Sequence, residues 1–177
     1  MVCTGNVARS PMGALLLHTE LEARGVAARV HSAGTIPWGG AAVPDAVAVM
    51  RERGLDLTPH VSQPLTRPLV AGADLILGMT RAHVWGVVAH DAAAADRTFL
   101  FAELPRLGAL VGARSPHEAP RAWAARVAAR RPNDQVPGRA EDEIGDPLNE
   151  PLAVYRATAT RLATAARVIS VLVAAPS

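Results

Sequence analysis

The residues whose types and spacing most clearly suggest a chemical reaction lie at the start of the chain, in the stretch MVCTGNVARSPMG. Cys3 is the only cysteine in 177 residues, and Arg9 and Ser10 follow it six and seven positions later. A thiolate is a strong nucleophile, and an arginine can hold two phosphate oxygens in a bidentate fork. This combination predicts attack on phosphorus with a covalent phosphocysteine as the intermediate. The alternative is core filling, because an unpaired cysteine behaves as a small apolar residue and is usually buried.

The residues that follow predict where this stretch lies in a fold. Ser10 can cap a helix, Pro11 suits its first turn, and Gly25 is placed to end it. A loop that leaves a parallel strand at Cys3 and enters a helix N-terminus is where open α/β sheets bind ligands. Backbone N–H groups and the helix dipole favour anions at that point, so they would also favour the thiolate.

Strand-like and helix-like stretches alternate along the rest of the chain. We expect strands at 27–31, 73–79 and 98–101, and helices at 44–53, 81–90 and from 152 onward. This alternation requires crossover connections, and it predicts an open, mostly parallel sheet of about four strands with helices on both faces. The length fits one α/β domain spanning residues 1–177.

The alternation breaks down between about 108 and 140, where proline, arginine and alanine dominate. This segment is interpreted as an insertion with mobile flanks and an amphipathic helix over 120–131, with Trp123 and Val127 on one side. A surface excursion is favoured over a lid or a partner site.

Composition excludes several classes of protein. Half of the residues are hydrophobic and the formal net charge is only +2, which argues against disorder and against a nucleic-acid partner. A single cysteine cannot form an intramolecular disulfide, which favours a reducing, cytoplasmic location. The apolar run from Leu152 to Ala175 is interrupted by Arg156, Arg161 and Arg167, so we expect a helix of the domain and no membrane association.

Four stretches of the sequence carry a resemblance to a known family. VCTGNVARSPM resembles the phosphate-binding loop of the low-molecular-weight protein tyrosine phosphatases, whose signature is a cysteine, five residues, an arginine, then serine or threonine. HSAGT, with Trp38 and VPD, resembles the second strand and variable loop of that family, and ADLILGM resembles its third strand. IGDPLNEPLAVY resembles the acid loop and the last helix. The resemblance covers most of the chain outside the insertion, and it favours Cys3 as a nucleophile over core filling.

The resemblance implies a role for individual residues. Cys3 would attack phosphorus, Arg9 would clamp the phosphoryl oxygens, and Ser10 would donate a hydrogen bond to the thiolate. Asp146, restrained by Pro147, would protonate the leaving group and later activate water; the alternative for it is an ordinary turn aspartate. The residues expected to bind phosphate are Thr4, Gly5, Asn6, Val7, Ala8, Arg9 and Ser10.

Supporting roles follow from the same resemblance. Asn6, Ser32 and His60 match positions that hold the phosphate loop in a strained shape, and Trp38 would wall the substrate cleft. For His60 the alternative is an exposed loop histidine, and for Trp38 it is packing on the rim. The remaining histidines have no recurrent ligand spacing, so we expect neither a metal nor another cofactor.

Departures from the family leave the substrate open. Ala8 replaces a second cysteine that many members carry, so a disulfide that would shield Cys3 cannot form. Leu148 and Asn149 replace aromatic residues that flank phosphotyrosine, which weakens the expectation of a strict tyrosine preference.

Three functions are therefore considered. The first is hydrolysis of phosphotyrosine or related phosphate monoesters, with a phosphorylated protein or a small phosphate ester as substrate. The second is arsenate reduction, which would need an external thiol because the chain has no second cysteine. The third is a phosphate-binding module without turnover, against which Asp146 argues.

The short stretch before Cys3 leads to a final expectation. The family has a full apolar strand before its cysteine, whereas this chain offers only Met1 and Val2. An interior strand of two residues would leave neighbouring backbone groups unpaired, at about 1–3 kcal/mol each. We therefore expect a natural start several residues upstream of Met1.

Overall fold

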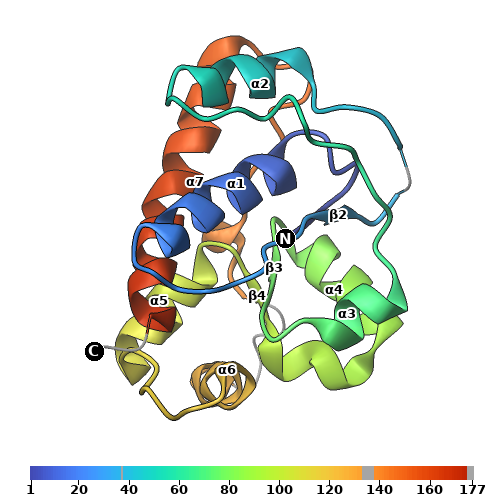
Figure 1. Cartoon of the computed structure of the whole chain (residues 1–177). Helices are drawn as coiled ribbons and strands as arrows, with labels where there is room; N and C mark the ends of the chain where they lie inside the picture. The colour runs from blue at the N-terminus through green and yellow to red at the C-terminus, as the bar shows by residue number, and fades with distance from the viewer. Residues whose placement is uncertain (37, 133–137, 175–177) are drawn as a thin grey trace.

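Four short strands form one parallel sheet in the computed structural model, which describes residues 1–36, 38–132 and 138–174. The sheet has the order β2-β1-β3-β4 (Figure 1). Its strands are β1 (Val2–Cys3), β2 (Ala33–Gly34), β3 (Ile76–Gly78) and β4 (Thr98–Leu100). Val2 pairs with Ala33 on one side and with Gly78 on the other. Cys3 therefore ends a central strand, at the edge where parallel sheets bind ligands.

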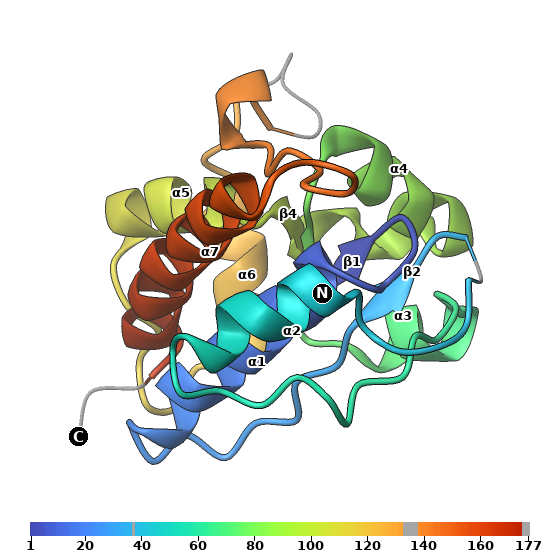
Figure 2. The ribbon, with the colours of Figure 1, turned by 90° about the horizontal axis from the view of Figure 1, so that it is seen from above.

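Helices cover both faces of the sheet, as Figure 2 shows from above. One face carries α1 (Arg9–Glu22), α2 (Pro44–Arg51), α5 (Glu103–Val111), α6 (Pro120–Ala128) and α7 (Leu152–Val173). The other face carries α3 (Arg67–Gly72) and α4 (Arg81–His90). Two 3-10 turns, η1 (Ala92–Arg97) and η2 (Ala140–Asp142), complete the secondary structure of the described residues.

Neighbouring residues of a strand enter opposite halves of the core. Cys3 and Leu77 belong to the larger cluster under α1 and α7, whereas Val2 and Ile76 belong to the smaller cluster under α3 and α4. This alternation is what the pleat of a β-strand requires. It places the side chain of Cys3 on the face covered by α1.

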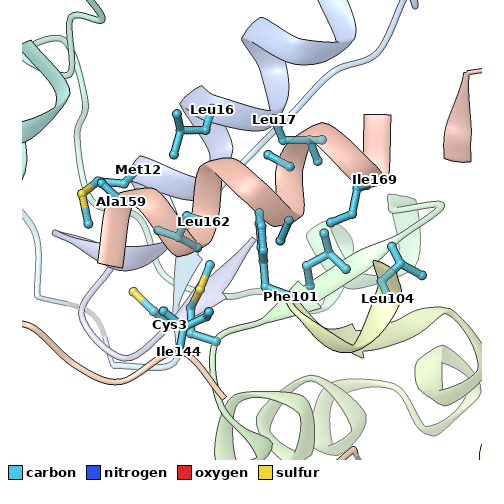
Figure 3. Packing of buried hydrophobic residues seen from close by; sticks show 14 of the residues in the cluster. Cys3, Met12, Leu16, Leu17, Phe101, Leu104, Ile144, Ala159, Leu162 and Ile169 are labelled. Carbon is cyan, nitrogen blue, oxygen red and sulfur yellow. The ribbon is translucent and has the colours of Figure 1, made fainter. Parts of the chain in front are cut away.

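The pairing of α1 with α7 forms the centre of the larger cluster. Met12 and Leu16 of α1 lie beside Ala159 and Leu162 of α7 (Figure 3). All four side chains are buried. Because α1 begins at Arg9, packing along α7 fixes the helix that starts at the end of the phosphate loop.

The fold confirms most of the expected elements and their order. The parallel sheet is confirmed, as are the helices at 44–51, 81–90 and 152–173 and the strands within 73–79 and 98–101. Ala175 lies outside the described residues. Among the helices that are described, none is long and apolar enough to cross a membrane.

Two local predictions are wrong. Residues 27–31 are not a strand, because with Val2 opposite Ala33 they have almost no neighbouring strand to pair with; they line a cavity of about 970 Å³. Ser10 does not cap α1, which has Ala8 at its N-cap position and no side-chain cap. The Ser10 hydroxyl is engaged with Cys3 instead.

The segment interpreted as an insertion is partly internal. The expected amphipathic helix forms as α6, and Trp123 and Val127 are buried in the larger cluster. Arg131 ties the end of this segment to the sheet: it pairs with buried Glu103 at 2.9 Å and lies over the Phe99 ring at 4.5 Å. The apolar face of α6 is therefore part of the core, which corrects the expected surface excursion for this helix, while most of the other described residues of the segment are exposed. Residues 133–137 lie outside the described part of the chain.

Candidate active site

The loop between β1 and α1 is almost completely buried. Every residue from Gly5 to Ser10 is buried, and Thr4 is partly exposed. The turn depends on Asn6, whose φ of 54° lies in the left-handed region that asparagine tolerates better than most residues. All seven residues expected to bind phosphate thus form one compact connection between the central strand and α1. We refer to residues 3–10 as the phosphate loop.

A chain of side chains inside this loop leads to Cys3. The Asn6 amide nitrogen donates to the Ser10 hydroxyl at 2.8 Å, and the Ser10 hydroxyl lies 2.9 Å from Cys3 Sγ. Because the amide N–H occupies a lone pair of the hydroxyl, the Ser10 hydrogen is free to point at sulfur. The contact expected between Ser10 and Cys3 is therefore present, and its orientation suits a thiolate.

The segment 60–63 supports the phosphate loop from outside. His60 Nε2 lies 2.6 Å from the Asn6 carbonyl oxygen, which only accepts, so this nitrogen carries the hydrogen. The Ser62 hydroxyl donates to the Gly5 carbonyl at 2.8 Å, and the Gln63 N–H donates to Asn6 Oδ1 at 3.0 Å. Ser62 and Gln63 are not among the residues predicted from the sequence; their position within three residues of His60 is the only signal that points to them.

Ser32 takes part only indirectly. Its carbonyl accepts a hydrogen bond from the Gln63 side chain at 2.9 Å. Among the described residues, its hydroxyl makes no hydrogen bond with the phosphate loop. The support expected from Ser32 thus reaches Asn6 through Gln63.

Arg9 connects the phosphate loop to the segment around Asp146. One guanidinium nitrogen donates to the Ile144 carbonyl at 3.2 Å, and another forms a short ion pair with the Asp146 carboxylate. The Arg9 side chain is 5% exposed and that of Asp146 is 47% exposed. Ile144 is anchored by its N–H to the Met79 carbonyl at 2.7 Å, and its side chain belongs to the same buried cluster as Cys3 (Figure 3). The three expected catalytic residues therefore belong to one connected group.

The two sides of the site opening differ in character. Trp38 is 53% exposed, and its indole ring covers Gly5 so closely that a Cβ at Gly5 would lie 2.8 Å from a ring carbon. On the Asp146 side, Leu148 is partly buried and Asn149 is exposed with a φ of 65°. An aromatic ring thus borders the loop on the Trp38 side, whereas Leu148 and Asn149 provide none on the Asp146 side.

A second histidine, which was not predicted as a site residue, contacts the loop. His83, the third residue of α4, places Nε2 2.9 Å from the Thr4 hydroxyl and Nδ1 3.0 Å from the Thr80 backbone nitrogen. Burial, together with the positive charge of Arg9, lowers the pKa of His83 to about 4. The spacing of Thr80 and His83 is that of a helix capping box, which is the sequence signal that could have found it.

The described residues contain no group of three or more histidine, cysteine, aspartate or glutamate side chains that could hold a metal ion. The site brings together the buried thiol of Cys3, the buried guanidinium of Arg9 and the half-exposed carboxylate of Asp146. Such a set can bind an oxyanion, attack its central atom and exchange a proton with the group that leaves.

Comparison with known proteins gives consistent matches. A family model described as low molecular weight phosphotyrosine protein phosphatase matches residues 1–105. A protein-arginine-phosphatase of Bacillus subtilis is 39% identical over 103 residues, covering 58% of this chain and 68% of that protein. A probable low molecular weight protein-tyrosine-phosphatase, AmsI of Erwinia amylovora, is 38% identical over 102 residues, covering 57% and 68%.

The match among solved structures extends over nearly the whole chain. A variant of the YwlE arginine phosphatase with a phosphorylated active-site serine superposes with a TM-score of 0.72 at 27% identity. The superposition covers 96% of this chain and 90% of that one. The likeness therefore includes the region beyond residue 105 that holds Asp146 and α7.

Proposed function

Since the chain belongs to the low molecular weight phosphotyrosine protein phosphatase family and is a hydrolase of that family, we propose that it dephosphorylates protein side chains through a phosphocysteine on Cys3. The observation that carries this proposal is the hydrogen-bonded series from Asn6 through Ser10 to Cys3 Sγ. Because Asn6 donates to the Ser10 hydroxyl, this hydroxyl can give its own hydrogen to Sγ, the atom that would attack phosphorus.

In the first step, the Cys3 thiolate attacks phosphorus on the side opposite the leaving group. The S–P bond forms as the bond from phosphorus to the leaving atom breaks, and Asp146 gives that atom a proton. Arg9 stabilises the charge on the equatorial oxygens, as a preorganised guanidinium does in phosphoryl transfer. In the second step, Asp146 takes a proton from water, the water oxygen bonds to phosphorus, and the S–P bond breaks to release phosphate and the thiolate.

The ion pair between Arg9 and Asp146 must change during this cycle. A bound phosphoryl group needs the same guanidinium N–H groups that hold the carboxylate. A bound dianion would therefore compete with the Asp146 carboxylate for Arg9. Substrate binding would thus release Asp146 from the ion pair, so that its carboxyl group can reach the leaving atom.

Two substrate classes are supported by different observations. The family name and the AmsI relative support phosphotyrosine or related phosphate monoesters. The arginine-phosphatase relatives, together with Leu148 and Asn149 in place of flanking aromatic residues, support phosphoarginine as the second candidate. Both reactions break a bond from phosphorus to an atom that must be protonated, so the same mechanism serves either.

The test of the mechanism is Cys3→Ser. Turnover of an aryl phosphate should fall by more than about 10⁴-fold, because removal of a nucleophile leaves only binding and electrostatic contributions. Binding of inorganic phosphate, measured by calorimetry, should remain, and slow transfer to the new serine should add one phosphoryl group to the mass of the protein. Turnover at the original rate would refute the role of Cys3.

The test of the substrate is a comparison of kcat/KM for a phosphotyrosine peptide, a phosphoarginine peptide and a small aryl phosphate. A marked preference for either peptide identifies the class. Phosphate binding without turnover of any of the three would instead favour a binding module and refute the proposed hydrolysis.

A further inference from the structure

The hydrogen bonds of His83 define which ring nitrogen carries its proton. The Thr80 backbone N–H can only donate, so Nδ1, 3.0 Å away, must be the acceptor. The Thr80 hydroxyl, 2.8 Å from the same nitrogen, adds a second contact. The neutral ring then carries its hydrogen on Nε2, which faces the Thr4 hydroxyl at 2.9 Å. The low pKa of His83, about 4, agrees with a neutral ring at physiological pH.

This tautomer determines what the Thr4 hydroxyl can do. A hydroxyl has one hydrogen and two lone pairs, and His83 fills one of the lone pairs of Thr4. Within the described part of the chain, no protein acceptor binds the hydrogen of this hydroxyl. Thr4 directly follows Cys3 and is partly exposed. Its hydrogen is therefore available to a ligand in the phosphate loop.

The contact with Thr4 places the His83 ring at the phosphate loop. The positive charge of Arg9 lowers the pKa of His83, whereas the carboxylates of Asp146 and Glu143 raise it. Because Thr4 and Arg9 belong to the same loop, a phosphoryl group held by Arg9 would enter the loop that carries the Thr4 hydroxyl.

We propose that His83 is a positioning residue, whose Nε2–H holds the Thr4 hydroxyl so that it donates its hydrogen to the bound phosphoryl group. The Thr80 backbone N–H fixes the tautomer, and the start of α4 thereby sets the direction of a hydrogen bond in the phosphate loop. The inference rests on the proposed phosphatase function. It assigns Thr4 a side-chain contact with the ligand in addition to its backbone contribution.

The decisive variant is His83→Asn. An asparagine at this position can still accept from the Thr80 N–H and cap α4, but it is too short to reach Thr4. We expect kcat/KM for an aryl phosphate and the affinity for inorganic phosphate each to fall by about 10-fold, the value of one hydrogen bond to a charged group. His83→Gln, whose amide can reach Thr4, should recover part of both. His90→Leu, on the exposed last turn of the same helix, is the matched control and should change neither quantity.

A double-mutant cycle separates positioning from a purely structural role. Thr4→Val should reduce phosphate affinity to the same extent as His83→Asn, and the double variant should show no further loss, because both changes remove one interaction. Independent, multiplying losses would overturn the proposal, as would a lower melting temperature with unchanged phosphate affinity. Phosphate binding needs no turnover, so a protein without hydrolytic activity would refute the proposed function while still testing the role of His83.

Discussion

The phosphate loop and the acid loop, residues 144–149, are held in very different ways. In the phosphate loop, Asn6 is buried and makes hydrogen bonds with Ser10, His60 and Gln63. In the acid loop, Asn149 has a similarly positive φ but is exposed, and Asp146 is fixed mainly by its pair with Arg9. One loop is thus held by several buried hydrogen bonds, while the other is held by an ion pair that, under the proposed function, a bound phosphoryl group would break.

This difference fits different roles for the two loops in the proposed reaction. A rigid cradle can stabilise the transition state without reorganisation during the reaction. In the proposed mechanism, Asp146 must instead approach the leaving atom and later a water molecule. Its ion pair with Arg9 would hold it when no substrate is bound.

Asp146→Asn should produce the largest effect on the acid loop. An amide cannot supply the proton, so we expect kcat for esters with poor leaving groups to fall by about 10²–10⁴-fold, with much less change for good leaving groups. Inorganic phosphate should inhibit more strongly, because no carboxylate competes for Arg9. Steady-state kinetics over a series of aryl phosphates tests both effects.

The control for this variant is Asp74→Asn, which removes an exposed carboxylate paired with Arg121 at 3.0 Å. It should leave the leaving-group dependence unchanged. If Asp146→Asn lowered kcat equally for good and poor leaving groups, Asp146 would have only a structural role.

A matched pair of substitutions, Asn6→Ala and Asn149→Ala, compares the two loops directly. Asn6→Ala should lower the free energy of unfolding by about 3 kcal/mol, because it combines a left-handed alanine with the loss of buried hydrogen bonds. Asn149→Ala should cost only about 1 kcal/mol, from backbone conformation alone. Denaturant unfolding measures both values, and similar losses would show that the acid loop is as tightly organised as the phosphate loop.

The smallest expected effect is on specificity. Leu148→Tyr restores an aromatic side chain beside the acid and should raise kcat/KM for a phosphotyrosine peptide relative to a small aryl phosphate by about 3- to 10-fold, as for one aromatic contact. Competition between the two substrates provides the measurement. An unchanged ratio would locate the ring-binding wall on the Trp38 side.

Sequence patterns predicted the sheet and most helices because these elements depend on local periodicity. The strand expected at 27–31 failed for a non-local reason: its apolar residues suit a strand, but pairing requires a neighbour in register. The burial of α6 could not be foreseen either, since an amphipathic helix shows which face is apolar and not what will cover it. The Glu103 and Arg131 pair depends on the same unforeseen packing.

The sequence alone indicated Cys3, Arg9 and Ser10 as candidate site residues, because their chemistry suits phosphate and they lie close together in the chain. The supporting contacts of Ser62 and Gln63 could not be predicted, because they reach the loop across more than 50 residues of sequence. His83 combines both cases, because its local capping spacing is visible in the sequence while its contact with Thr4 spans 79 residues.

The packing of α1 against α7 also has a consequence for how the protein is made. Residues 9–22 cannot bury their apolar face until residues 152–173 have been synthesised, because the two helices are partners in one cluster. Contacts of such sequence separation slow folding, since a long loop must close before they contribute. On the ribosome, the nascent chain should therefore remain incompletely folded until residues 152–173 emerge, and the thiol of Cys3 should stay open to alkylating reagents until that moment.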